Sequence, residues 1–201
     1  TGRGNTRPID PNILSRAKAN FDRENLSALV AIGGDGTLSV ALQMHAAGWP
    51  VVGVPKTIDN DLDATLMTFG FDTAVSCAVD ALDRLQSTAQ SHDRVMVLEV
   101  MGRYAGWIAT QAGLAGGADV ILIPEILFNY DAVCRKIDRR EAEGKHFTLV
   151  IVAEGARPAG QDYVSESPDT KDREIRLGGI GQQVAGEIQT RTQKESRCVV
   201  L

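Results

Sequence analysis

The segment SALVAIGGDGTLSVALQMHAAG (residues 27–48) decides the fold. Residues 27–33 form an apolar run with the length of a buried strand, and the stretch from Asp35 onward predicts a helix that ends at Gly48. A strand that passes through a short glycine turn directly into a helix is the first half of a βαβ unit. The segment therefore predicts a parallel sheet.

The same alternation continues through the rest of the chain. Further strands are expected at 49–55, 93–100, 119–124 and 146–154, and further helices at 71–90, 103–117, 131–144 and 178–193. The polar stretch 156–176 has no apolar periodicity and predicts a long exposed loop. Strands that alternate with helices in this way predict an α/β fold with a largely parallel sheet.

Composition excludes several classes of protein. The 201 residues include 21 Lys and Arg against 26 Asp and Glu, a net charge of −5, and 43% are hydrophobic. No basic block is present, which argues against a nucleic-acid partner. The apolar runs stop well short of the ~20 residues of a membrane helix, so we expect no membrane association.

The cysteines and the two ends of the sequence indicate its context. Cys77, Cys134 and Cys198 are odd in number and widely spaced, which fits neither a disulfide framework nor a zinc site and predicts a reducing, cytoplasmic compartment. The sequence begins with Thr1 rather than Met and ends in CVVL, which has the pattern of an interrupted strand. We therefore expect an internal piece of a longer protein.

In parallel sheets, chemistry is found where the strands end. The first strand is followed by Gly33-Gly34-Asp35-Gly36-Thr37. Glycines let backbone N–H groups approach a phosphate closely, the start of a helix favours anions, and an adjacent aspartate can hold Mg²⁺. The alternative interpretation is a tight turn that only connects strand and helix.

The second strand is followed by Pro55-Lys56-Thr57-Ile58-Asp59-Asn60-Asp61. Two carboxylates in such proximity repel each other unless a cation or a substrate proton lies near them. One of them can accept the proton of a substrate hydroxyl while the other positions metal or water. A solvated polar turn is the alternative.

The later strands end in further polar residues. Arg103, in Met101-Gly102-Arg103, can neutralise a phosphoryl group or orient an anionic substrate, unless it only forms a surface ion pair. Glu125 and Glu154 can both accept hydrogen bonds from sugar hydroxyls, although a charge at a helix start explains Glu125 equally well. We expect Asp35, Asp59 and Arg103 to surround one cavity.

The motifs GGDGT, PKTIDND, MGRYAGW and VAEGA, in this order and spacing, resemble the phosphofructokinase family across essentially all 201 residues. The resemblance implies Rossmann-like parallel sheets with helices on both faces, in two subdomains. Residues 1–72 would bind the nucleotide and residues 73–201 the sugar phosphate, each subdomain lacking a part. The implied reaction is the glycolytic phosphorylation of fructose 6-phosphate to fructose 1,6-bisphosphate.

The resemblance also implies roles for single residues. Asp59 matches the general base that accepts the proton of the sugar hydroxyl, Thr57 and Asp61 flank it, and Asp35 matches the aspartate associated with Mg²⁺. Residues that match the nucleotide-binding positions are Arg3, Gly34, Asp35, Gly36 and Thr37. Residues that match the sugar-phosphate positions are Thr57, Asp59, Met101, Gly102, Arg103 and Glu154, with Arg103 also stabilising the charge that develops during transfer.

Arg94 and Arg197 resemble the pair that reaches the 6-phosphate from a neighbouring subunit, which implies a homo-oligomer, a dimer or a tetramer. The family's N-terminal glycine-rich phosphate loop and the substrate-binding residues expected beyond Leu201 are absent from this sequence. We therefore expect residues 1–201 to be inactive when isolated.

Three positions bear on the choice of phosphoryl donor. Within the family, glycine at the position of Gly36 leaves room for the α-phosphate of ATP, which favours ATP over pyrophosphate. Lys56 points the other way, because members that use pyrophosphate carry lysine there. Val40 occupies a position at which members of the family frequently carry glycine, and its branched side chain would narrow the nucleoside pocket. The expected donor is ATP, with pyrophosphate as the alternative.

Other kinds of protein share parts of this pattern. Lipid kinases and NAD kinases also use GGDGT, but the combination of TIDND with MGR is not expected in them. A noncatalytic subunit that binds sugar phosphate usually lacks the base or the charge-stabilising arginine, and this sequence has both Asp59 and Arg103.

Overall fold

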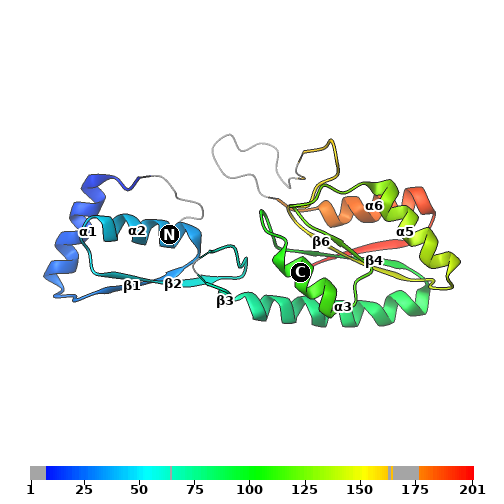
Figure 1. Cartoon of the computed structure of the whole chain (residues 1–201), viewed down its shortest axis with the longest axis horizontal. Helices are drawn as coiled ribbons and strands as arrows, with labels where there is room; N and C mark the ends of the chain where they lie inside the picture. The colour runs from blue at the N-terminus through cyan, green and yellow to red at the C-terminus, as the bar shows by residue number, and fades with distance from the viewer. Residues whose placement is uncertain (1–7, 64, 163, 165–176) are drawn as a thin grey trace. The chain divides into compact units, whose positions relative to one another are not determined.

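The structure is a computed structural model that describes residues 8–63, 65–162, 164 and 177–201. Helices and strands alternate (Figure 1). Their bounds are α1 Pro11–Arg23, β1 Leu29–Gly33, α2 Asp35–Ala46, β2 Val51–Thr57, β3 Phe69–Gly70, α3 Phe71–His92, β4 Val95–Val100, α4 Trp107–Ala115, β5 Val120–Leu122, α5 Tyr130–Ala142, β6 Thr148–Ala153, α6 Ile180–Thr192 and β7 Ser196–Val200. All paired strands in these elements run parallel, so the predicted α/β architecture is confirmed.

Several elements differ from the sequence prediction, among them the short strand β3, which was not expected. Helix α1, which the sequence analysis did not assign, begins at Pro11 after Asp10, whose side chain accepts a hydrogen bond from the Asn12 N–H. Strand β2 continues through Thr57 instead of ending at residue 55. Helix α4 begins only at Trp107 because the backbone of Gly102 has a positive φ of 144° and turns the chain first. Among the described residues, no helix combines the length and apolar composition needed to cross a bilayer.

The described chain divides into two compact units. The N-terminal unit contains the described residues up to Thr57 together with Leu62–Gly70. The C-terminal unit contains Ile58–Asp61 and the described residues from Phe71 onward. The boundary predicted from the sequence lies at 72/73. Contacts within the structure separate the units after Gly70 and assign the short segment Ile58–Asp61 to the C-terminal unit.

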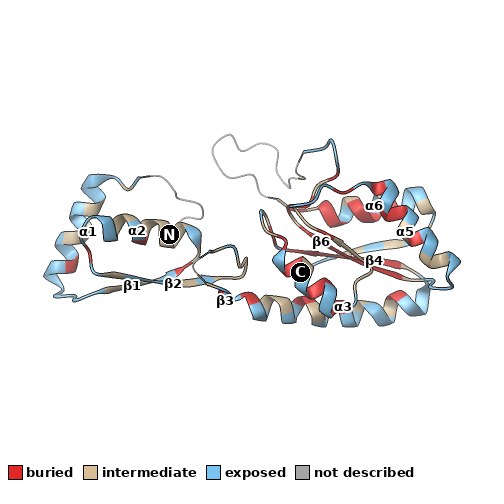
Figure 2. Cartoon of the chain, in the orientation of Figure 1, coloured by how far each residue is buried: buried red, intermediate tan, exposed pale blue. Residues whose placement is uncertain are grey.

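The C-terminal unit is built on a four-stranded sheet in the order β5-β6-β4-β7, with helices on both faces. Alternate residues of a strand point to opposite faces. Val97 and Val150 therefore pack with α5 and α6, while Leu98 and Ile151 pack with α3 and α4. Every residue of β4 and β6 is buried, as the red central strands in Figure 2 show.

The N-terminal unit is built on a smaller sheet in the order β1-β2-β3. Helix α2 packs on one face, where a Cβ on Gly53 of β2 would lie 2.9 Å from Leu38. The other face carries Val30, Ile32 and Val52, which are 58%, 61% and 61% exposed. Within the described residues this face has no covering helix. In Figure 2 the strands of this sheet are mostly tan and pale blue, whereas β4 and β6 carry the red of buried residues.

A buried carboxylate anchors α6 to the central strand of the larger sheet. Glu99 of β4 is 2% exposed, and its two oxygens accept hydrogen bonds from the N–H groups of Gly179 (3.1 Å) and Gly181 (2.8 Å). These N–H groups lie at the start of the helix, where backbone donors lack partners and a negative charge is stabilised. The helix start thus compensates a buried charge that would otherwise be costly.

Candidate active site

The GGDGT motif forms a tight turn between β1 and α2 of the N-terminal unit. Gly34 precedes the helix and makes no side-chain capping hydrogen bond. A Cβ on Gly33 would lie 2.4 Å from Oγ1 of Thr37, so only glycine allows the first turn of α2 to come this close to the strand. Since the first N–H groups of a helix lack partners within it, this helix start can bind an anion such as a phosphate.

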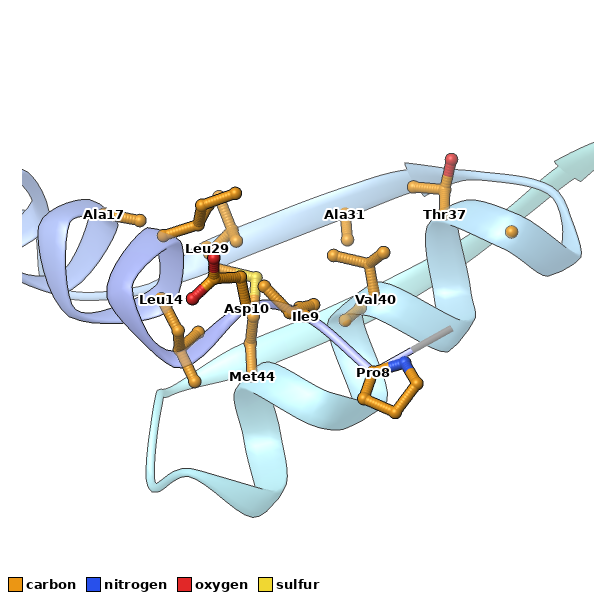
Figure 3. A pocket seen from close by; sticks show the side chains of 13 residues that line it. Pro8, Ile9, Asp10, Leu14, Ala17, Leu29, Ala31, Thr37, Val40 and Met44 are labelled. Atoms are coloured by element: carbon orange, nitrogen blue, oxygen red, sulfur yellow. The ribbon is translucent and has the colours of Figure 1, made fainter. Parts of the chain in front are cut away.

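A pocket lies beside this turn, between α1, α2 and β1 (Figure 3). Its volume is about 450 Å³. Gly36 and Thr37 belong to its wall, and most of the remaining lining is apolar, including Leu14, Leu29 and Met44. Val40 lines the pocket without closing it. This pocket was not predicted from the sequence, because α1, which forms one of its walls, was not predicted.

Thr57 ends β2 at the same edge of the sheet as the glycine turn. A Cβ on Gly34 would lie 3.3 Å from the Cβ of Thr57, so the threonine side chain lies against the turn. Lys56 is exposed on the same strand. The structure therefore brings Thr57 together with the predicted nucleotide-binding residues Gly34, Asp35, Gly36 and Thr37.

In the C-terminal unit, Asp59 and Arg103 are close enough to Glu154 for their charges to act on its carboxyl group. Glu154 follows β6 and is half-buried. Burial raises the pKa of its carboxyl group, and a backbone hydrogen bond from Gly102 and the charge of Arg103 partly oppose this rise. The negative charges of Glu99 and Asp59 add to it. This arrangement combines a proton acceptor, a cation and a carboxyl group at one end of the sheet.

Two glycines hold the Arg103 turn against the end of β6. The N–H of Gly155 donates to the carbonyl of Gly102 over 3.1 Å. A Cβ on Gly155 would lie 2.0 Å from the carbonyl oxygen of Arg103, and one on Gly102 would lie 2.8 Å from that of Ala105. Because these neighbours are backbone atoms, neither position accepts a larger residue without moving the turn. Met101, at the start of this turn, is 41% exposed.

Glu125 has a structural contact. Its Oε1 atom accepts a hydrogen bond of 2.8 Å from the N–H of Gly106, the residue that precedes α4. This contact agrees with the alternative left open in the sequence analysis, a negative charge at a helix start.

Arg94 and Arg197 lie together where strands β4 and β7 begin, whereas Arg103 lies beyond the end of β4. Arg94 directly precedes β4 and Arg103 follows it, with the six residues Val95–Val100 between them. Six strand residues span about 20 Å. Glu195 contacts both arginines where the two strands begin, a residue that the sequence analysis did not single out.

The predicted site residues are thus distributed over three places. Asp35 and its neighbours belong with Thr57 to the N-terminal unit, whereas Asp59, Asp61, Arg103 and Glu154 belong to the C-terminal unit. Arg94 and Arg197 form a separate group in the C-terminal unit. Arg3 lies outside the described residues.

Comparison with known proteins gives consistent matches. The family model described as Phosphofructokinase matches residues 1–201. An ATP-dependent 6-phosphofructokinase of Chloroflexus aggregans is 54% identical over 194 residues, which are 96% of this chain and 52% of that protein. A pyrophosphate--fructose 6-phosphate 1-phosphotransferase of Amycolatopsis mediterranei is 55% identical over 189 residues, 94% of this chain and 55% of that protein.

A solved structure shares the fold. Phosphofructokinase from Pichia pastoris in the T-state superposes with a TM-score of 0.80 at 30% identity, covering 96% of this chain and 22% of that one. The chain spans about half the length of the curated relatives it matches, 52% for the Chloroflexus protein. With its four motifs, its parallel sheets and a family match over residues 1–201, the chain belongs to the phosphofructokinase family.

Proposed function

We propose that the protein of which this chain is part is an ATP-dependent 6-phosphofructokinase that transfers a phosphoryl group to the 1-hydroxyl of fructose 6-phosphate. The observation that carries the proposal is the group formed by Asp59, Arg103 and Glu154 at one end of the larger sheet. Phosphoryl transfer requires little covalent chemistry from the protein and depends on alignment and charge stabilisation. These three side chains supply a base, a cation and a sugar contact.

Each residue has a distinct role in this proposal. Asp59 accepts the proton of the attacking sugar hydroxyl. Arg103 neutralises the charge that develops on the transferring group and also binds the anionic substrate, together with Met101 and Gly102. Glu154 accepts hydrogen bonds from sugar hydroxyls, which it does best as a carboxylate.

The N-terminal unit holds the donor in this proposal. The uncapped start of α2 and the adjacent Thr57 side chain bind the donor phosphates. Mg²⁺ usually combines one or two carboxylates with substrate phosphates and water. The exposed carboxylate of Asp35 fits such a site, although no cluster of three or more His, Cys, Asp or Glu side chains occurs within the described ranges. When bound, the metal neutralises donor oxygens.

The pocket beside Gly36 favours ATP as the donor. Nucleoside pockets are concave and mainly apolar, and the 450 Å³ pocket between α1, α2 and β1 has both properties. Pyrophosphate has no nucleoside and would leave it unfilled. The relatives named as ATP-dependent 6-phosphofructokinases also support this choice. Pyrophosphate is the second candidate, favoured by the exposed Lys56 and by the 55% identical pyrophosphate-dependent relative.

We further propose a cytoplasmic homo-oligomer. Arg94 and Arg103 lie at opposite ends of strand β4. A second subunit therefore provides a simple way to bring Arg94 and Arg197 to a site that contains Arg103. The three cysteines are free, which fits a reducing compartment.

The experiment that tests the function uses the full-length protein with fructose 6-phosphate and either ATP or pyrophosphate. We expect saturation at a lower concentration of ATP than of pyrophosphate. Saturation at a lower pyrophosphate concentration would replace ATP with the second candidate. Binding of the sugar phosphate without turnover by either donor would identify a noncatalytic subunit instead.

Asp59→Asn tests the site in the same assay. Because the amide cannot accept the proton, we expect kcat to fall at least ~100-fold, with little change in the KM for fructose 6-phosphate. Asp63→Asn, an exposed aspartate outside the proposed site, is the control and should match the parent. A near-normal kcat in Asp59→Asn would remove Asp59 from the role of base.

A further inference from the structure

Glu195 lies between the two arginines that are proposed to bind the sugar 6-phosphate. Its Oε2 atom is 2.7 Å from Nε of Arg94. Its Oε1 atom accepts hydrogen bonds from Nε (3.0 Å) and Nη2 (2.8 Å) of Arg197. One carboxylate thus uses a different oxygen for each guanidinium and bridges the pair.

The backbone holds these three residues in a fixed arrangement. The N–H of Val95, next to Arg94, donates to the carbonyl of Glu195 over 3.0 Å. Arg197 lies in β7, in register with Met96 of β4. The N–H of Arg94 donates to Ala89 at the end of α3. The side chains therefore start from rigid positions on two hydrogen-bonded strands.

The charges explain why a bridge is useful at this place. Two guanidinium groups held side by side repel each other, and flexible arginine side chains would otherwise move apart in solvent. Contacts with Arg197 and Arg94 hold the pKa of Glu195 below its ordinary range, so it stays ionised at neutral pH. The group of three keeps one net positive charge.

The arginines remain accessible to a ligand. The side chains of Arg94 and Arg197 are 22% and 61% exposed. Glu195 contacts Arg94 at its Nε atom. Guanidinium groups bind phosphate through two parallel N–H donors, and the Nη groups of Arg94 and Nη1 of Arg197 can take part.

We propose that Glu195 is a positioning residue that holds Arg94 and Arg197 together as a preformed receptor for the sugar phosphate. This inference rests on the proposed function, in which the two arginines bind the 6-phosphate. Glu195 itself does not contact the substrate. It lowers the conformational entropy that phosphate binding would otherwise have to remove from two long side chains.

The test compares full-length Glu195→Gln with the parent and with Glu187→Gln. Glu187 is a matched control, because it pairs with a single arginine, Arg191, and its side chain is 39% exposed against 44% for Glu195. The amide introduced by Glu195→Gln has one carbonyl oxygen and cannot bridge two guanidinium groups by ionic contacts. We expect the KM for fructose 6-phosphate to rise about fivefold to tenfold, while kcat and the KM for the donor stay within about twofold of the parent.

The variant Glu195→Asp separates the effect of the negative charge from the effect of the side-chain length. It keeps the charge but is one methylene shorter, so we expect a KM for the sugar between those of the parent and Glu195→Gln. A lower KM in Glu195→Gln would show that Glu195 competes with the phosphate and would overturn the proposal, as would a KM equal to that of Glu187→Gln. A parent enzyme that fails to phosphorylate fructose 6-phosphate refutes the proposed function, and the role of Glu195 then falls with it.

Discussion

The two sheets of this chain differ in how completely they are covered. In the C-terminal unit, α3 and α4 cover one face and α5 and α6 the other, and the central strands are fully buried. In the N-terminal unit, Val30 and Ile32 of β1 are more than half exposed, although the strand is as apolar as those of the larger sheet. Near-continuous apolar strands are typical of sheets covered on both sides. The composition of β1 is therefore suited to a covering that the described part of the chain does not provide.

The largest expected effect concerns the C-terminal unit. Gly155→Ala would place a Cβ 2.0 Å from a backbone oxygen and push the Arg103 turn away from β6. We expect a destabilisation of about 3 kcal/mol, measured by urea unfolding, and a loss of most turnover in the full-length enzyme.

Gly186→Ala, in α6, is the control, since a Cβ there meets nothing within 4 Å. It should be neutral or stabilising by up to about 1 kcal/mol. Equal behaviour of the two variants would show that the turn is free to shift.

The second prediction compares the two sheets directly. Ile151→Ala removes a fully buried side chain and should cost about 3 kcal/mol in residues 1–201, whereas Ile32→Ala, at 61% exposure, should change stability by less than about 0.5 kcal/mol. Hydrogen exchange of the strand amides reports on each unit separately. In the full-length protein we expect Ile32→Ala to become clearly destabilising. If it stays neutral there, the open face is a native surface.

The third prediction uses the raised pKa of Glu154. A carboxyl group with a raised pKa in the folded state contributes stability below its ordinary pKa of 4.5, and this contribution is lost as the pH rises through the raised value. Glu154→Gln resembles the neutral form at every pH. At pH 7 we therefore expect its Tm to exceed that of the parent by about 1–3 °C, and the difference should disappear below about pH 4.

The same variant should bind the sugar less well, because an amide has lost the charge that strengthens hydrogen bonds from hydroxyl groups. A stabilised protein with a higher KM for fructose 6-phosphate is the combined expectation. A Tm difference that grows toward acid pH would contradict the stated sign of the pKa shift.

The smallest effect concerns the N-terminal unit. Val40→Ala removes two methyl groups from the wall of the pocket, and we expect the KM for ATP to rise about fivefold from lost apolar contact, with no change in the KM for the sugar. Leu42→Ala, an exposed position of the same helix, is the control. A lower KM for ATP in Val40→Ala would instead show that the branched side chain narrows the pocket, as the sequence analysis expects.

Local sequence signals were sufficient for most of the fold. Apolar runs and glycine turns predicted the strands of both sheets except the two-residue β3, and β4 and β6 are buried as their composition indicates. Helix α1 was missed although the signals were present, namely Asp10-Pro11 as a start and apolar residues at 13, 14, 17 and 21. With α1 assigned, the wall of the pocket would have been visible in the sequence.

The candidate site was less accessible to sequence reasoning. The expectation that Arg103 and Glu154 lie near each other came from the strand ends, because β4 and β6 are parallel neighbours in one sheet. Asp59 follows β2 of the other sheet, so the same rule does not place it beside them. The contacts of Glu125 with Gly106 and of Glu195 with two arginines depend on pairings across 19 residues or between strands β4 and β7, which no local pattern reveals. Charged residues at strand ends therefore indicated candidate site residues, but not which of them contact other side chains or helix starts instead.

The assignment of Ile58–Asp61 has a consequence for protein engineering. The chain leaves the N-terminal unit after Thr57, returns at Leu62 and leaves again after Gly70. A chimera joined at 70/71 would consequently take Ile58–Asp61 from one homologue and the C-terminal unit that this segment packs with from the other. The stability of such a chimera would depend on whether these four residues fit their new neighbours.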